Sequence, residues 1–209
     1  MVADTANSEI LRQSVIASLD RKVCNTLNTC CVVASRAKEL VPVLLDGMNE
    51  AAANLGQEYR IHVTEGSEAF ISEGSFNRKV TINRADGQHE EFQASTLPVV
   101  DIGREWEWET SPEITLIVVQ SLEEAIDLFN AHSPRLVASL ISNDEQEHQH
   151  FYERVDAPFI GDSYTRWVDG QRALNKPELG LSNWANGRLF GRHAILTGDS
   201  VYTVRTRYT

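Results

Sequence analysis

The chain has 209 residues, enough for one domain, or one large and one small lobe, around a buried core. Its 19 basic and 30 acidic residues give a net charge of −11, and the basic residues form no long stripe, so nucleic acid and anionic membrane surfaces are not expected partners. Three cysteines, two of them adjacent, do not make a disulfide framework. We expect a cytoplasmic protein, because the sequence predicts neither a secretion signal nor a membrane span.

The first part of the chain predicts a helix, a strand and a second helix. Apolar residues at helical spacing place the first helix from Ser8 to Ser18. The apolar run from Cys30 to Ala34 is typical of a short buried strand. Ser35 is expected to cap the following helix, which ends near Gly56, and Pro42 predicts a kink or a late start in it.

The pattern is weaker between residues 59 and 100. Short alternating pieces at 60–63 and 79–82 suggest strands, and the turn residues Ala85-Asp86-Gly87 follow the second of them. We therefore expect a β-hairpin around this turn.

The later part alternates strands and helices. A clear buried strand covers residues 115–119, and Ser121-Leu122-Glu123-Glu124 has the spacing of a capping box at a helix start. A strand at 136–141, a helix opened by Asn143 or Asp144, and a strand near 159–160 follow. This order predicts an α/β fold with a mostly parallel sheet and helices on its faces.

Cys24 has the local chemistry of a nucleophilic thiol. It lies between the basic pair Arg21-Lys22 and a short polar turn that opens into the apolar strand. A free thiol has a pKa of about 8.5, and basic neighbours or a helix N-terminus would increase the thiolate fraction. The alternative is a small buried hydrophobic residue, and for Cys30 and Cys31 we expect simple core packing.

The cysteine stretch also resembles a known family. Val23-Cys24-Asn25-Thr26-Leu27-Asn28-Thr29 is similar to the Val-Cys-Asn-Ala-Leu-Glu-Thr stretch that holds the catalytic cysteine of the gamma-glutamyl phosphate reductases, or glutamate-5-semialdehyde dehydrogenases, of the aldehyde dehydrogenase superfamily. Further segments follow in the family's order, including Ser121 to Ile126 and Thr165-Arg166-Trp167-Val168-Asp169-Gly170. The resemblance implies a three-layer α/β domain of the aldehyde dehydrogenase catalytic type over residues 1–209.

The resemblance implies roles for five residues. Cys24 would attack the acyl phosphate carbon and form a thioester, and Asn25 and Arg166 would bind the substrate, since a guanidinium suits an oxyanion. Glu109 falls near a glutamate that holds the nicotinamide ribose in the superfamily, although a solvated acidic face is an alternative interpretation. Glu178 could serve as a general base or belong to an ordinary turn.

Several features depart from the family. Asp162 replaces an amide, residues 171–177 form a longer polar stretch, and no glycine-rich phosphate loop follows a strand. Family members are about twice this long, so we expect the nucleotide-binding domain to be absent, and NADP(H), the cofactor that the family implies, is not expected to bind this chain alone. The residues predict no metal site, because His148 and His150 would point to different helix faces.

Two functions stay open. The first is the catalytic half of a gamma-glutamyl phosphate reductase in proline synthesis, acting on a small molecule with a nucleotide-binding domain or partner chain. The second is a non-enzymatic remnant or interaction module without hydride transfer. The sequence leaves the oligomeric state open: members of the superfamily self-associate through a hairpin and a C-terminal strand, and residues Val201 to Val204 could supply such a strand in a homo-oligomer.

Overall fold

The computed structural model describes residues 1–157 and 159–165, four two-residue strands between positions 178 and 197, and residue 207. Its centre is a parallel sheet in the order β1-β6-β2-β5, which confirms the α/β prediction. The strands are β1 (Thr29–Val33), β6 (Glu113–Val119), β2 (Arg60–Thr64) and β5 (Ala94–Leu97). Strands β1 and β6 are short apolar runs, and the nearly continuous burial of β1, β2 and β6 suits a sheet covered on both faces.

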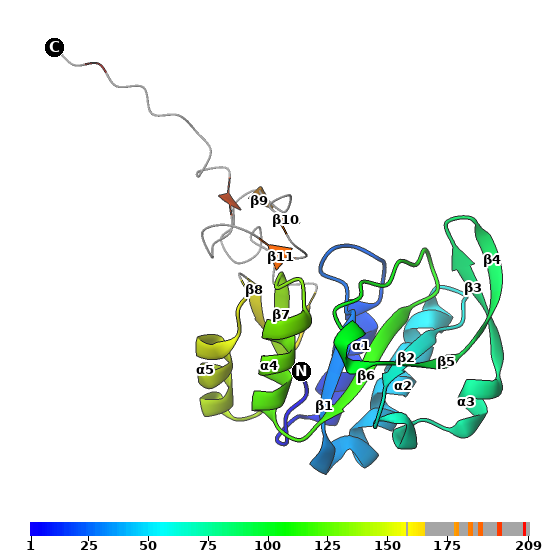
Figure 1. Cartoon of the computed structure of the whole chain (residues 1–209), viewed down its shortest axis with the longest axis horizontal. Coiled ribbons are helices and arrows are strands. Elements are labelled where there is room, and N and C mark those ends of the chain that lie inside the picture. The colour runs from blue at the N-terminus through cyan, green and yellow to red at the C-terminus, as the bar shows by residue number, and fades with distance from the viewer. Residues whose placement is uncertain are drawn as a thin grey trace.

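Val2 joins this sheet to a second parallel pair, β7 (Val137–Leu140) and β8 (Phe159–Asp162). It bridges Val32 of β1 on one side and Ile141, just after β7, on the other, both in the parallel sense. Four backbone hydrogen bonds of 2.8 to 3.2 Å hold the seam, and they join residues 1–3 to Cys31, Val33 and Ile141. Residues 1–3 therefore join the four-stranded sheet and the β7–β8 pair into one sheet (Figure 1).

Two helices cover one face of the sheet. The first is α1 (Ser8–Ser18), as predicted, with Asn7 as its N-cap, and the second is α2 (Ala37–Asn54), which continues through Pro42. The prediction that Ser35 caps α2 was wrong: a 3₁₀ turn, η1 (Ala34–Arg36), precedes the helix, and the Ser35 hydroxyl bonds the carboxylate of Asp4 instead.

The packing of α1 on α2 depends on Gly47. A Cβ atom at that position would lie 3.1 Å from the Arg12 carbonyl oxygen and from two Val15 carbons, so the absence of a side chain lets the helices approach closely. This contact fixes α1, the helix that precedes the cysteine turn.

The opposite face carries α4 (Leu122–His132) and α5 (Glu145–Arg154). Ser121 accepts a bond from the Glu124 amide at 3.2 Å, as predicted, but the Glu124 carboxylate returns to the amide of Gln120 rather than to that of Ser121. Asp144 caps α5. With α1 and α2 behind the sheet, the fold has the three layers that were predicted (Figure 1).

The segment between β2 and β6 crosses the far edge of the sheet. It contains the predicted hairpin, β3 (Lys79–Arg84) with β4 (Gly87–Phe92), in antiparallel register. Besides β5, its other elements are short: η2 (Glu68–Phe70), α3 (Glu73–Asn77) and η3 (Val99–Asp101).

Four short strands lie near the C-terminus. They are β9 (Glu178–Leu179), β10 (Trp184–Ala185), β11 (Arg188–Leu189) and β12 (Leu196–Thr197), and they pair antiparallel as β9 with β12 and β10 with β11. The strand expected from Val201 to Val204 lies outside the described residues. In the part of the chain that is described, no helix is long and apolar enough to cross a membrane.

Candidate functional site

Cys24 lies in a tight turn between α1 and β1. The Thr26 amide donates to the Val23 carbonyl at 3.0 Å. The buried Thr26 hydroxyl accepts from the Val23 amide at 2.8 Å and donates to the Arg21 carbonyl at 2.7 Å. These three bonds fix the backbone on both sides of Cys24 while its thiol stays exposed.

The charges around this turn are compensated. The Lys22 ammonium lies 3.3 Å from Glu105, and the Arg21 guanidinium lies 3.9 Å from Asp20. The elements that flank the turn add no helix N-terminus, because α1 ends at Ser18 and η1 begins only at Ala34, beyond β1. The structure thus gives Cys24 exposure and a fixed backbone rather than an uncompensated positive field.

A cavity of about 270 Å³ opens beside the turn. Its walls come from α1, the cysteine turn, β1, the loop after η3, the end of α4, and β7. Cys24, Asn25, Thr26, Leu27 and Asn28 all line it, as do Leu11 and Val15 of α1. The volume is close to that of pockets for small organic ligands.

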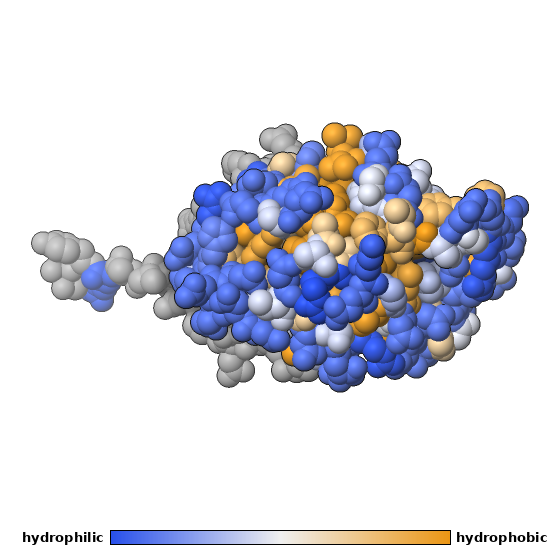
Figure 2. All heavy atoms as spheres, turned by 90° about the horizontal axis from the view of Figure 1, so that it is seen from below, coloured by the Kyte–Doolittle hydropathy of each residue, from blue (hydrophilic) through white to orange (hydrophobic). Residues whose placement is uncertain are grey.

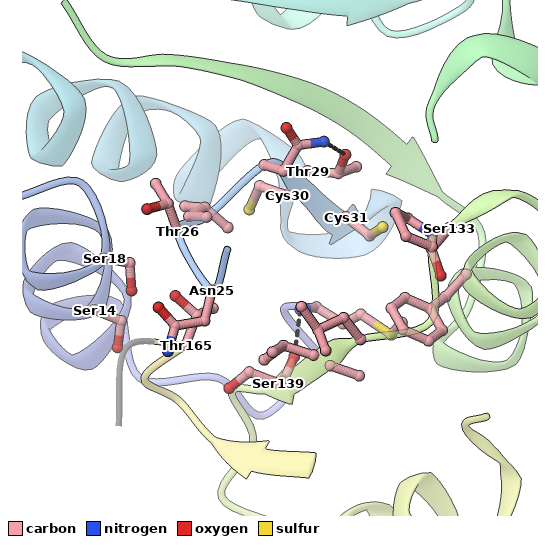
Figure 3. Close-up of a pocket in the computed structure, with 18 of the residues that line it drawn as sticks. Ser14, Ser18, Asn25, Thr26, Thr29, Cys30, Cys31, Ser133, Ser139 and Thr165 are labelled. Atoms are coloured by element: carbon pink, nitrogen blue, oxygen red, sulfur yellow. Dashed lines mark hydrogen bonds between the residues drawn. The ribbon is translucent and has the colours of Figure 1, made fainter. Parts of the chain in front are cut away.

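The polar groups of this cavity gather at one end. Figure 3 shows Ser14 and Ser18 of α1 facing Asn25 of the turn and Thr165, which follows β8. Hydroxyl and amide groups both donate and accept hydrogen bonds. This end of the cavity is therefore suited to a polar ligand group.

The charged side chains of the described lining, those of Arg135 and Glu105, are paired. Arg135 bonds the Asp156 carboxylate and the Asn130 carbonyl, and Glu105 pairs with Lys22. The N-terminal ammonium of Met1, which also lines the cavity, donates to the Ser139 carbonyl at 2.6 Å and forms no ion pair with a carboxylate of the described residues.

Cys30 and Cys31 are buried in β1, which confirms core packing, although both also line the cavity. Burial raises the pKa of the Cys30 thiol to about 12 and raises that of Cys31 as well. Because the thiolate is the reactive form, Cys24 is the nucleophile candidate among the three.

Of the other predicted site residues, the structure places only Asn25 on the cavity wall. Asn25 lies next to Cys24 on the cavity wall. Glu109 is exposed and does not line the cavity, so the structure does not bring it together with Cys24. Arg166 lies outside the described residues, and of Glu178 only the backbone of β9 is described.

A second polar cluster lies where β2, β5 and β6 meet, away from the cavity lining. The fully buried Glu113 carboxylate contacts Arg60, Arg84 and His62, and the His62 ring stacks on Trp106 at 3.5 Å. Sequence reasoning missed this cluster. The signal available in the sequence was Glu113, an acid at the start of an apolar run. A buried acid needs polar partners, but the sequence does not show which residues they are.

The fold is that of the aldehyde dehydrogenase superfamily. It matches gamma-glutamyl phosphate reductase of Thermotoga maritima with a TM-score of 0.63 at 16% identity, over 82% of this chain and 35% of that one. An engineered glycolyl-CoA reductase, solved with NADP+ bound, gives 0.51 at 14% identity, over 81% and 41%. An NAD-dependent aldehyde dehydrogenase of Sinorhizobium meliloti gives 0.50 at 16%, over 78% and 36%.

Comparison with known sequences relates the chain to one kind of enzyme within that fold. The chain is a distant homologue of gamma-glutamyl phosphate reductase over part of that protein's length: it is 25% identical to the Oenococcus oeni enzyme over 164 residues and 27% identical to the Chlorobium limicola enzyme over 162. Each alignment covers 77% of this chain, but only 31% and 33% of the relatives. The chain thus spans about a third of the relatives it matches, and no family model matches it.

Proposed function

We propose that this chain supplies the thiol-bearing part of a gamma-glutamyl phosphate reductase-type active site. The observation that carries the proposal is the exposed Cys24, held by the Thr26 hydrogen bonds at the mouth of a cavity of small-molecule size. Distant homology to the reductases supports it.

The proposed step is thioester formation. The Cys24 thiolate attacks the acyl carbon of gamma-glutamyl phosphate, the S–C bond forms, the bond from that carbon to the phosphate oxygen breaks, and phosphate leaves with the electron pair. Asn25, on the same wall, would orient the acyl group.

The structure does not bring the implied nicotinamide contact to this thiol. Glu109, the residue assigned to the nicotinamide ribose by resemblance, is exposed and does not line the cavity. No step proposed for this chain therefore runs through NADP(H). We assign hydride transfer to a nucleotide-binding domain or partner chain.

One face of the molecule suits such a partner. Figure 2 shows an apolar band crossing the face seen from below, between hydrophilic margins. A broad exposed apolar surface marks an interaction site in soluble proteins. We propose that the nucleotide-binding part covers this face.

Acyl transfer to Cys24 tests the function directly. Gamma-glutamyl phosphate would be generated in situ from glutamate and ATP by a kinase, and the chain then examined by mass spectrometry and phosphate release. We expect a glutamyl adduct on Cys24 and a single burst of about one phosphate per chain, lost in Cys24→Ala and kept in Cys31→Ala. The absence of the adduct in the native chain would contradict the proposal.

A specific observation favours the alternative, a remnant of the fold without this chemistry. Both basic side chains beside Cys24 are paired with carboxylates, which weakens their effect on the thiol. In that case Cys24 would react with small alkylating reagents no faster than an unstructured cysteine peptide of the same local sequence.

A further inference from the structure

Ser95, His62 and Glu113 form a hydrogen-bonded series outside the cavity. The Ser95 Oγ atom lies 2.8 Å from the Nδ1 atom of His62, and the Nε2 atom of the same ring lies 2.6 Å from the Glu113 Oε1 atom. None of these three residues lines the cavity that contains Cys24. A hydroxyl, an imidazole and a carboxylate in this order are the parts of a serine nucleophile with its base.

Strand register places the three side chains on one face of the central sheet. His62 of β2 lies opposite Ser95 of β5 on one side and opposite Thr115 of β6 on the other. Glu113 precedes Thr115 by two positions, and residues two apart in a strand share a face. The fold therefore brings together groups that are 33 and 51 positions apart in the chain.

Glu113 sets the direction of these hydrogen bonds. Although burial opposes it, hydrogen bonds from His62 and Arg84 lower the pKa of Glu113 to about 2, so at neutral pH it is a carboxylate that can only accept. Burial lowers the pKa of His62, so its ring is neutral. Nε2 then carries the ring proton, and Nδ1 accepts from the Ser95 hydroxyl. In this arrangement the histidine can remove the serine proton.

The ring is held in place while the hydroxyl stays accessible. Trp106 stacks on His62 with 3.5 Å between the ring centroids and 5° between the planes, and its Nε1 atom donates to Thr115 at 2.8 Å. Ser95 is partly exposed, and its strand β5 is at the edge of the four-stranded sheet. A small molecule can thus approach the Ser95 oxygen from solvent while the base behind it is fixed.

Arg60 supplies a positive charge beside the hydroxyl. Its Nη2 atom lies 3.4 Å from the Ser95 Oγ atom, and its Nη1 atom lies 3.0 Å from Glu113. A guanidinium fixed next to the nucleophile can stabilise the oxyanion that develops when a hydroxyl adds to a carbonyl carbon. The cluster therefore holds a nucleophile, a base, an acid that orients the base, and a cation for the oxyanion.

We propose that Ser95 and His62 form a second catalytic site, which hydrolyses small carboxylic esters. The Ser95 oxygen attacks the ester carbonyl carbon, and its proton passes to the Nδ1 atom of His62. The new O–C bond replaces the bond to the alkoxy oxygen, and the alcohol leaves with the proton from His62. Water, deprotonated by the same nitrogen, then releases the carboxylic acid, and Ser95 recovers its proton. This activity involves neither Cys24 nor the proposed function.

A fluorophosphonate probe tests the nucleophile. The Ser95 oxygen would attack phosphorus, the O–P bond forms, the P–F bond breaks and fluoride leaves. Peptide mapping by mass spectrometry identifies the labelled residue, so a reaction at Cys24 is counted separately. We expect Ser95 to be labelled at least about 100-fold faster than any other serine of the chain. An unlabelled Ser95, under conditions that fully label a serine hydrolase, would overturn the proposal.

Variants connect the label to the cluster. Ser95→Ala should abolish it, and His62→Gln should slow it by at least about 100-fold. Thr96→Ala is the matched control, because Thr96 is the next residue of β5, is exposed and points to the other face of the sheet, and it should keep the native rate.

Ester turnover is the second readout. Hydrolysis of p-nitrophenyl acetate would be followed in a Cys24→Ala background, so that the thiol does not contribute. Adding Ser95→Ala to this background should remove the hydrolysis above the rate in buffer, whereas adding Thr96→Ala should not. Equal rates with and without the Ser95 hydroxyl would contradict the second site and leave the proposal for Cys24 as it stands.

The tautomer of His62 provides a test without any substitution. Nitrogen-15 NMR of the native chain at pH 7 should show a protonated Nε2 atom and an unprotonated Nδ1 atom. A proton on Nδ1 would leave the Ser95 hydroxyl without a base and would overturn the proposal. This measurement and Ser95→Ala both keep the buried pair of His62 and Glu113, so they decide the question even where His62→Gln does not fold.

Discussion

The Nε2 atom of His62 lies 2.6 Å from the Glu113 Oε1 atom, and both side chains are buried. The other ring nitrogen, Nδ1, lies 2.8 Å from the Ser95 hydroxyl. Because a carboxylate can only accept, Nε2 carries the proton in the neutral ring, and Nδ1 accepts from Ser95. Arg60 and Arg84 contact Glu113 and also Glu91, so two acids and two guanidiniums balance while His62 stays neutral.

This balance predicts a loss of stability in acid. Burial alone would raise the pKa of Glu113, but hydrogen bonds from His62 and Arg84 outweigh it and lower this pKa to about 2. Burial lowers the pKa of His62 despite its bond to Glu113. For each group the folded pKa is below the unfolded one, so its stabilisation is complete above the unfolded value and is lost as pH falls through the folded value.

We therefore expect the free energy of unfolding to fall as pH drops below about 6.5, where unfolded histidine protonates. A further loss on the order of 3 kcal/mol should follow between about pH 4.5 and 2, as Glu113 protonates. Urea titrations from pH 8 to 2 measure both losses. Glu113→Gln should lose about 3 kcal/mol at pH 7, because two partly buried guanidiniums lose one of the two carboxylates that they share and keep only Glu91. Glu109→Gln, at an exposed position, should match the native chain.

Thr26→Val should loosen the cysteine turn. The substitution keeps the shape but leaves the Val23 amide and the Arg21 carbonyl without the hydroxyl that bonds both. We expect a loss of about 1 to 3 kcal/mol in the free energy of unfolding. Amide exchange at Val23 should accelerate, whereas Thr26→Ser should retain native protection. Unchanged exchange in the valine variant would show that the hydroxyl does not fix the turn.

Thiol titration should distinguish the three cysteines. With Ellman's reagent under native conditions, Cys24 should react because it is exposed, while Cys30 and Cys31 should react only after unfolding, because they are buried and burial raises the pKa of each thiol. Cys24→Ser should remove the fast phase and leave the other two thiols unchanged in denaturant. A second fast thiol in the native chain would contradict this assignment.

Gly103→Ala should destabilise the loop that forms one wall of the cavity. A Cβ atom there would lie 1.9 Å from the His132 carbonyl oxygen, which belongs to the last turn of α4. Backbone must move to admit it, so we expect a loss of at least about 2 kcal/mol, measured by urea unfolding. Gly74→Ala is the control, since its nearest neighbour would be 3.9 Å away and alanine favours a helix.

Ser14→Ala should raise the free energy of unfolding by about 1 kcal/mol. The variant removes a buried hydroxyl that has no partner in the described structure, and alanine has the higher helix propensity. Thermal and urea unfolding measure this gain, and Ser8→Ala should stay within about 0.5 kcal/mol of the native chain. A marked loss of stability in Ser14→Ala would indicate that the hydroxyl has a partner after all.

Much of the fold could be predicted from the sequence, because short sequence patterns within each helix or strand identify it. Apolar runs identify β1 and β6, and Ser121 and Asp144 are helix caps that bond to their own segments. Ser35 misled the prediction because its hydroxyl bonds Asp4, which is 31 positions away.

The candidate site, too, could be predicted from the sequence only where its residues are neighbours in the chain. The cysteine turn is local, so Cys24 and Asn25 could be identified together from the sequence. The Glu113 cluster could not, because its partners Arg60 and Arg84 come from strands far away in sequence. The charge compensation of Lys22 by Glu105 also required the folded chain, since 83 positions separate the two residues.

The bridges that Val2 makes to Val32 and Ile141 have a consequence for the order of folding. Strands β1, β6, β2 and β5 form one unit with α1 and α2, whereas β7 and β8 form another with α5. Contacts that close such long loops form late, so each half can fold before the join. The cavity borders both halves and is lined by Val2 itself, which makes it a late product of folding.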